Sequence, residues 1–344
     1  MPDEAKLPWY KKRKVQIPAA IIIVLFVFSI FIMAINYRFP QFFTLTPHES
    51  APGQVLAVED DPEKEPVAAP PANWPKGLMT ANTLLIISDD LFGNWLPNDK
   101  FWPTIFLDNP QNFQLGELEA LRYTTRVMRD GITRLRTGGT NDPDIESAFT
   151  LLNNDPLKWI LPSAESRYKK AADHFRAYRD RVAVSKPDEV FFPTNDNLRD
   201  LLDQYAALLG VINTRLSNAP NQTRYKISED AVRPADQAQD EQWVDTHVPW
   251  RQVDDNFYYA QGAAYVLRQM MVAIKYDFSK ILTDREAMPQ VDSIISVLNQ
   301  AQFEPWWVMN GDVGSIWANH SMQLQSILEN ARQKFRNLND TMGK

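Results

Sequence analysis

Two glutamates stand where an acid catalyst would be expected. Glu165 follows Pro162 in the first turn of a predicted helix, and Glu304 lies next to a tryptophan pair, Trp306 and Trp307. A carboxylic acid in an apolar cleft keeps its proton near neutral pH and can act as the general acid in glycoside cleavage. This pattern defines one enzyme hypothesis, a hydrolase or lyase that acts on cell-wall or other glycans. Acids are also common in the first turns of helices, where they favour the positive end of the helix dipole.

The remaining reactive residues form no recognisable catalytic or metal-binding pattern. The chain has no cysteine, which excludes a thiolate nucleophile, a Cys-ligated metal and disulfides. Its four histidines are not spaced as metal ligands. The acidic pairs Asp89-Asp90 and Asp254-Asp255 are adjacent in predicted helices, where neighbours point about 100° apart, so neither forms a dyad. We therefore predict neither a cofactor nor a metal site.

Tryptophans gather in two loops rich in proline and asparagine. Trp95 and Trp102 lie in the loop 94–113, and Trp306 and Trp307 lie in a second loop near the C-terminus. Exposed tryptophans often dominate protein interfaces, but they also pack loops against helix ends. Both interpretations stay open, and we treat these four residues as candidate partner-binding residues.

An uncharged apolar run, residues 15–35, determines where these residues would act. At 1.5 Å per residue it spans about 31 Å as a helix, roughly the thickness of the hydrocarbon core of a bilayer. Its few polar residues share no face, unlike those of a buried soluble helix. Aromatic residues flank the run, as at a membrane interface. We predict a single transmembrane helix in the lipid bilayer.

The charges around this run predict its orientation. Lys11, Lys12, Arg13 and Lys14 immediately precede it, whereas acids follow it. By the positive-inside rule the basic tail, residues 1–14, stays in the cytoplasm, where it contacts anionic lipid. No small-x-small cleavage site follows the run, so we favour an uncleaved signal anchor over a cleaved signal peptide. The predicted location is the bacterial inner membrane, with the C-terminal domain in the periplasm.

The exported part of the chain is acidic. After the basic tail, 31 basic residues face 41 acidic ones. An acidic domain is a poor candidate for binding nucleic acid. It is also not expected to lie against an anionic membrane surface.

Composition divides the exported part into a spacer and a domain. Residues 36–76 are rich in proline, alanine and acids, so we predict a semi-rigid spacer that holds the domain away from the membrane. In residues 77–344 apolar side chains recur at spacings of three and four, the period of amphipathic helices. No alternating run is long enough to predict a sheet. We predict an all-α periplasmic domain, packed as a helical bundle, with halves at 77–220 and 247–344 separated by a polar loop.

Several short motifs follow one another in the order of a known family. They are Asn98-Asp99, Leu107-Asp108-Asn109-Pro110, Leu161-Pro162-Ser163, Asp196-Asn197-Leu198, Asp254-Asp255 and Ala318-Asn319-His320-Ser321. Together with the apolar run, they resemble the bacterial inner-membrane proteins catalogued as domain of unknown function 2333. The resemblance reaches from the apolar run to near the C-terminus. It implies the topology and an envelope setting, but no activity and no catalytic residue.

These observations predict a non-catalytic protein that binds or scaffolds an envelope protein partner. Two alternatives stay open. One is the glycan-acting enzyme with Glu165 or Glu304 as its acid. The other is a tethered periplasmic chaperone, which would expose an apolar cradle between the two halves.

Overall fold

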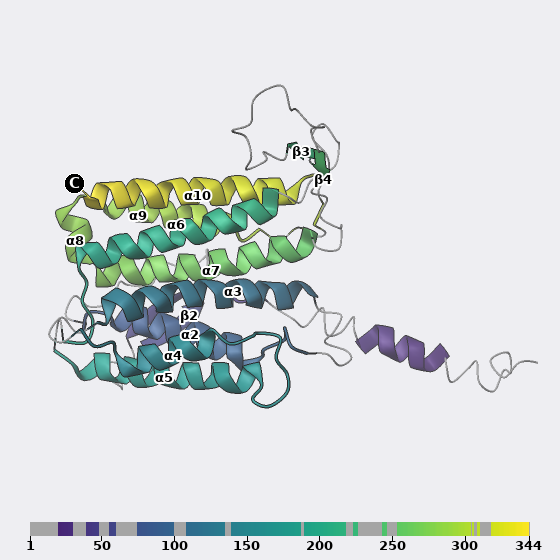
Figure 1. Ribbon diagram of the computed structural model, residues 1–344, viewed down its shortest axis with the longest axis horizontal. Coiled ribbons are helices and arrows are strands. Elements are labelled where there is room, and N and C mark those ends of the chain that lie inside the picture. The colour runs from purple at the N-terminus through teal and green to yellow at the C-terminus, as the bar shows by residue number, and fades with distance from the viewer. Residues whose placement is uncertain are drawn as a thin grey trace, which may run out of the picture.

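The computed structural model is built almost entirely of helices in the residues that it describes (Figure 1). These residues are 20–29, 39–47, 55–59, 74–99, 108–134, 139–186, 189–217, 223–225, 243–245, 253–303, 305, 308–309 and 318–343. The helices are α2 (Leu78–Gly93), α3 (Asp108–Val127) with the π-helical turn η4 (Met128–Ile132), α4 (Pro143–Leu152), α5 (Ala164–Val184), α6 (Asn195–Ser217), α7 (Val253–Asp277), α8 (Ser279–Asp284), α9 (Met288–Gln300) and α10 (His320–Gly343). The all-α fold class predicted from the sequence is confirmed.

The helices are arranged in three layers (Figure 1). α3 and α7 lie in the middle, α2, α4 and α5 cover one side, and α6, α9 and α10 cover the other. Apolar residues at helical spacing face the core from every layer, and Leu118, Leu202 and Leu267 are fully buried examples. This burial is what the period of three and four predicts.

α3 and α7 meet backbone to backbone at two glycines. A Cβ atom on Gly116 would lie 2.0 Å from the carbonyl oxygen of Tyr259, and one on Gly262 would lie 2.0 Å from that of Phe113. Real Cβ atoms do not approach a backbone so closely, so only glycine fits at either position. The two central helices are thus closer than side-chain packing would allow.

Two short antiparallel strand pairs accompany the helices, although the sequence predicted no sheet. β1 (Phe43–Pro47) pairs with β2 (Val55–Glu59), and β3 (Thr223–Tyr225) pairs with β4 (Trp243–Asp245). β1 alternates apolar residues with threonine, a period-two pattern too short to stand out beside the prolines that follow.

Residues 39–45 belong to the domain, which differs from the predicted spacer. The ring of Phe39 stacks on Tyr258 with centroids 5.4 Å apart, and the ring of Phe42 stacks on Tyr265 at 5.8 Å. Aromatic residues just after an apolar run are typical of a membrane interface, but here they cover α7. The division of the domain into two halves stays a prediction.

Among the described residues, no helix is long and apolar enough to cross a membrane. The described part of the predicted span is the helical segment 20–29. The rest of residues 15–35 and the basic residues 11–14 lie outside the described residues. In the helical segment, seven large apolar side chains from Ile21 to Phe28 are between 54% and 66% exposed.

Candidate functional site

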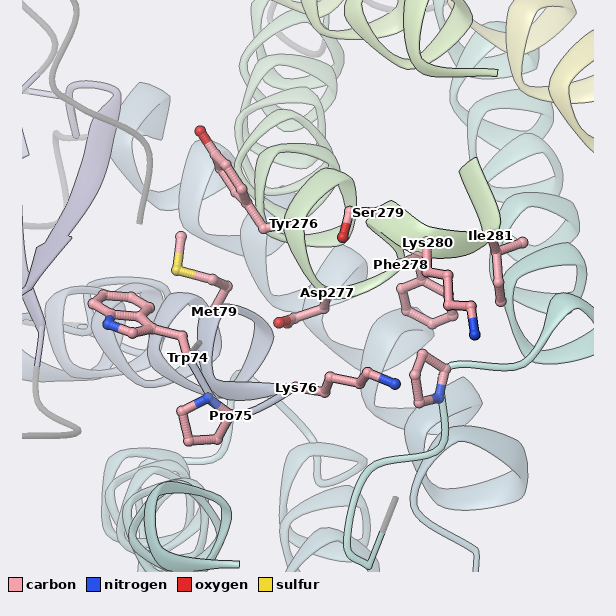
Figure 2. Close-up of a pocket in the computed structure, with 11 residues that line it drawn as sticks. Trp74, Pro75, Lys76, Met79, Tyr276, Asp277, Phe278, Ser279, Lys280 and Ile281 are labelled. Atoms are coloured by element: carbon pink, nitrogen blue, oxygen red, sulfur yellow. The ribbon is translucent and has the colours of Figure 1, made fainter. Parts of the chain in front are cut away.

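A cavity of about 230 Å³ lies where α2 begins and α7 ends (Figure 2). We call it the end pocket, and its lining includes Trp74, Lys76, Met79, Tyr276, Lys280 and Ile281. A second cavity of about 450 Å³ adjoins it and shares Lys76, Lys280 and Ile281 with it. Pro193 also lines both cavities, so three separate segments of the chain contribute to one concave surface.

Asp277, the last residue of α7, holds the pocket together. Its carboxylate accepts hydrogen bonds from the backbone N–H of Gly77 at 3.0 Å and from the backbone N–H and hydroxyl of Thr80 at 2.7 and 2.6 Å. These donors belong to the start of α2, so a residue of α7 serves as the cap of another helix. Burial raises the pKa of Asp277 to about 6, although the bonds from Thr80 and Gly77 act in the opposite direction. The carboxylate is thus already hydrogen-bonded to groups of the protein itself.

Lys76 and Lys280 give the end pocket its positive charge. Figure 2 shows both ammonium groups on the side of the pocket opposite Trp74, with Asp277 between. Cations beside an aromatic and aliphatic wall suit a ligand that joins an anionic group to an apolar one. Among the described residues, Asp277 is the only carboxylate that lines this cavity, and it caps α2. The geometry of the cavity therefore favours binding over acid–base catalysis.

A second buried acid, Glu117, lies on α3, and the exposed Asp90 of α2 is close enough to influence it. Glu117 is only 3% exposed. Its pKa lies well above the usual range, first because of burial and second because of the negative charge of Asp90. Partial burial also raises the pKa of Asp90. A protonated buried glutamate is the form that a general acid needs, but Glu117 lines neither the end pocket nor the cavity beside it.

The sequence analysis missed Glu117, although its position carried a signal. Glu117 lies four residues after Phe113 and four before Leu121, in the middle of the apolar stripe of α3. An acid on the buried face of an amphipathic helix is rare, because burying a charge without a partner is costly.

Replacing Glu117 with glutamine should therefore change how the stability of the protein depends on pH. The folded-state pKa lies above the unfolded-state value, so the folded state binds more protons and its stability falls as pH rises from 4.5. One such group contributes a slope of about 1.4 kcal/mol per pH unit. Glutamine does not titrate. We expect the unfolding free energy of Glu117→Gln, relative to that of the natural protein, to increase from pH 4.5 upward in urea titrations.

Glu119→Gln is the matched control on the same helix. Glu119 forms a half-exposed ion pair with Arg122 at 3.1 Å, so its replacement should produce a small effect with no comparable pH trend. If the two variants showed the same pH trend, Glu117 would not be the buried acid described above.

A charged network joins α4 to α5. His174 Nδ1 lies 2.8 Å from Asp144, and Arg181 contacts both Asp144 and Asp142. Burial raises the pKa of Asp144, but hydrogen bonds from Arg181 and His174 outweigh it and hold the pKa below its usual value. Asp142 also caps α4 by accepting hydrogen bonds from two backbone N–H groups. This network stabilises the packing of the two helices.

Of the two acids that the sequence nominated, the structure describes Glu165. Glu165 is half-exposed in the first turn of α5, two residues after the capping residue Ser163. It lines neither of the two adjoining cavities, and its position suits the helix dipole. Glu304 lies outside the described residues. The catalytic assignment of both residues stays a prediction.

Of the four candidate partner-binding tryptophans, the structure describes Trp95. Its side chain is 4% exposed, lies 5.0 Å from the ring of Tyr168, and donates a hydrogen bond to the carbonyl of Pro156 at 3.2 Å. Trp95 therefore packs a loop against helix ends, the second of the two interpretations. Trp102, Trp306 and Trp307 lie outside the described residues, and their role in binding stays a prediction.

Comparison with known proteins places the chain in one family. The model of a family described as an uncharacterized protein conserved in bacteria (DUF2333) matches residues 11–344. No match is found among curated proteins or among solved structures. The matched region covers both the apolar run and the whole helical domain.

Proposed function

This chain belongs to the DUF2333 family of bacterial proteins, and from that premise we propose that it is a membrane-anchored binding protein of the bacterial envelope. In this proposal residues 15–35 span the inner membrane, and the basic residues 11–14 contact the cytoplasmic leaflet. The helical domain lies in the periplasm. Its role is to bind or scaffold an envelope partner, without catalysis.

The helical segment 20–29 carries this proposal. Its seven large apolar side chains are more than half exposed and are distributed around the helix. Such a helix is stable only in an apolar environment. The segment lies within residues 15–35, a run of 21 residues that holds no charge. This run directly follows four consecutive basic residues. A lipid bilayer accounts for all of these features together.

The end pocket supports a binding role for the exported domain. It offers two cations and an apolar wall, while Asp277 is occupied in capping α2. The glycan-acting enzyme has less support, because the buried acid Glu117 does not line this pocket. In the proposed protein, an anionic and partly apolar group of the partner occupies the end pocket. A role for Trp102, Trp306 and Trp307 in binding stays a prediction.

Single cysteines introduced into this cysteine-free chain test both parts of the proposal. We expect a membrane-impermeant thiol-reactive cross-linker to reach Ser279→Cys in intact spheroplasts, and to reach Ala5→Cys only after lysis. Ser279→Cys should capture one dominant envelope partner. Adding Lys76→Gln and Lys280→Gln should reduce that capture, whereas Lys169→Gln, an exposed residue of α5, should not.

Each other outcome points to a different protein. Reaction at Ala5→Cys alone would reverse the topology. Many unrelated adducts would favour the chaperone, and no protein adduct would shift the search to glycan or lipid ligands. Capture unaffected by the lysine substitutions would move the binding surface away from the end pocket.

A further inference from the structure

The loop between α4 and α5 exposes four large apolar side chains within five residues. We call residues 157–161 the apolar loop. The exposed fractions are 51% for Leu157, 45% for Trp159, 61% for Ile160 and 91% for Leu161. Clusters of this kind on a soluble surface mark a contact with another apolar body.

Hydrogen bonds fix the backbone of the apolar loop. The carbonyl of Lys158 accepts from the backbone N–H of Ala164 at 2.8 Å and from the side chain of Asn98 at 3.2 Å. Just before the loop, the carbonyl of Pro156 accepts from Trp95 at 3.2 Å. The apolar side chains therefore project from a fixed backbone, so their exposure belongs to the ordered structure of the domain.

The apolar loop lies at the end of the domain where the chain enters it. Phe39 packs on Phe113 in α3, with ring centroids 4.9 Å apart. The next residue, Gln114, accepts a hydrogen bond from the backbone N–H of Leu96 at 2.8 Å. Leu96 lies two residues before Asn98, which holds the apolar loop. Three consecutive contacts thus connect the entry of the chain to the loop.

Little chain separates this end of the domain from the proposed span. From residue 35 to Phe39 there are four peptide steps, which extend over about 14 Å at most. Figure 1 shows the loop between α4 and α5, in teal, at the end of the bundle beyond which the helical segment 20–29, in purple, lies. If residues 15–35 span the bilayer, this end of the domain is held close to its outer surface.

The surroundings of the apolar loop are basic, in contrast to the acidic domain as a whole. Residues 153–170 include four basic and two acidic side chains. Lys158, Lys169 and Lys170 are exposed. Apolar and tryptophan side chains flanked by lysine are typical of segments that enter the interface of an anionic membrane.

We propose that the apolar loop inserts into the outer leaflet of the membrane that residues 15–35 span. This inference rests on the proposed anchor. The domain then has a second attachment point, which limits its rotation about the short connection at residues 36–38. The end pocket, at the start of α2 and the end of α7, lies at the opposite end of the bundle (Figure 1) and faces away from the membrane.

Spin labels on single cysteines test this insertion in the full chain. The protein is reconstituted singly in nanodiscs of phosphatidylethanolamine and phosphatidylglycerol, and each label is probed with oxygen, which concentrates in lipid, and with a water-soluble nickel complex. We expect Leu161→Cys to be accessible to oxygen and protected from nickel. Val184→Cys is the matched control: it is 86% exposed, against 91% for Leu161, but it lies at the other end of α5. Its label should show the reverse pattern.

A third label separates failure of the insertion from failure of the anchor. Val24→Cys should be accessible to oxygen if residues 15–35 span the bilayer. A lipid signal at position 24 with a water signal at 161 would overturn the insertion and leave the anchor standing. Protection of position 161 from both reagents would indicate a protein contact and would also overturn it. A water signal at position 24 would overturn the anchor, and the insertion with it.

Discussion

Replacing Gly262 with alanine should lower the stability of the domain by about 3 kcal/mol or more, among the largest effects of any single methyl group in this protein. The new Cβ would lie 2.0 Å from the carbonyl oxygen of Phe113 and 3.1 Å from the backbone nitrogen of Glu117. Backbone atoms of a helix cannot move aside as a flexible side chain can. α3 and α7 would have to separate, and the apolar contacts of all three layers depend on their spacing. Urea unfolding of the purified protein measures the loss.

Gly93→Ala is the control for the general effect of glycine in a helix. Gly93 is the last residue of α2, and a Cβ there would have no atom within 4 Å. Its replacement should be neutral or stabilising by roughly 0.5 kcal/mol.

Gly116→Ala should lower the stability as much as Gly262→Ala does. Combining the two should cost less than the sum of their separate effects, since one separation of the helices relieves both clashes. Equal stability of Gly93→Ala and Gly262→Ala would show that α3 and α7 do not meet at these glycines.

Local periodicity was sufficient to predict the helices but not their contacts. Apolar spacing of three and four predicted helices in residues 77–344, and α5, α6 and α10 each bury one face. The central helix α7 keeps the same spacing but is buried on all sides from Ala260 to Met271. The same pattern contains Gly116 and Gly262 as isolated glycines within helices. Such glycines weaken a helix, so they indicate a close approach. Which backbone each glycine contacts depends on how segments more than a hundred residues apart pack together. The local sequence pattern does not show this.

The start of α2 shows the same limit. Thr80 and Asn82, near its start, are of residue types that commonly cap helices. The helix begins earlier, at Leu78, after Gly77 in a left-handed conformation with φ of 87°. Its capping carboxylate belongs to Asp277, 197 residues away from Thr80 in the chain. The end pocket could not be predicted for the same reason, since the segments that line it are distant in sequence.

Aromatic residues were the most ambiguous part of the sequence. Phe39 and Phe42 follow an apolar run, and Trp95 lies in a loop, so their types alone fit a membrane interface or a partner surface. In the structure all three pack within the domain. Among the described residues of the helical domain, an exposed apolar cluster lies instead at residues 157–161, where the sequence shows no periodic pattern. Two of the hydrogen bonds that fix this loop come from Asn98 and Trp95, 60 and 61 residues away from their acceptors in the chain.

Replacing Asp277 with alanine should destabilise the protein by roughly 3 kcal/mol, because buried donors at the start of α2 would lose their acceptor. The backbone N–H groups of Gly77 and Thr80 and the Thr80 hydroxyl all donate to this carboxylate. Asparagine preserves the shape but offers only one acceptor oxygen, and its amide group would face an N–H group. Asp277→Asn should therefore also be destabilising, and thermal unfolding at several pH values provides the measurement.

The pH dependence of Asp277→Asn tests which ionisation state the fold prefers. The pKa of Asp277 is about 6 in the folded protein, against 3.8 as the ordinary value. Between these values the folded state binds more protons, so the stability of the natural protein falls as pH rises, by a total on the order of 3 kcal/mol. Asparagine does not titrate. The stability that Asp277→Asn loses relative to the natural protein should therefore be largest near pH 4 and should shrink up to about pH 6. The exposed control Asp284→Asn should show no such trend. A deficit that grew with pH would mean that the ionised carboxylate is the preferred form. Its interaction with the helix dipole and the three donors would then outweigh the cost of burial.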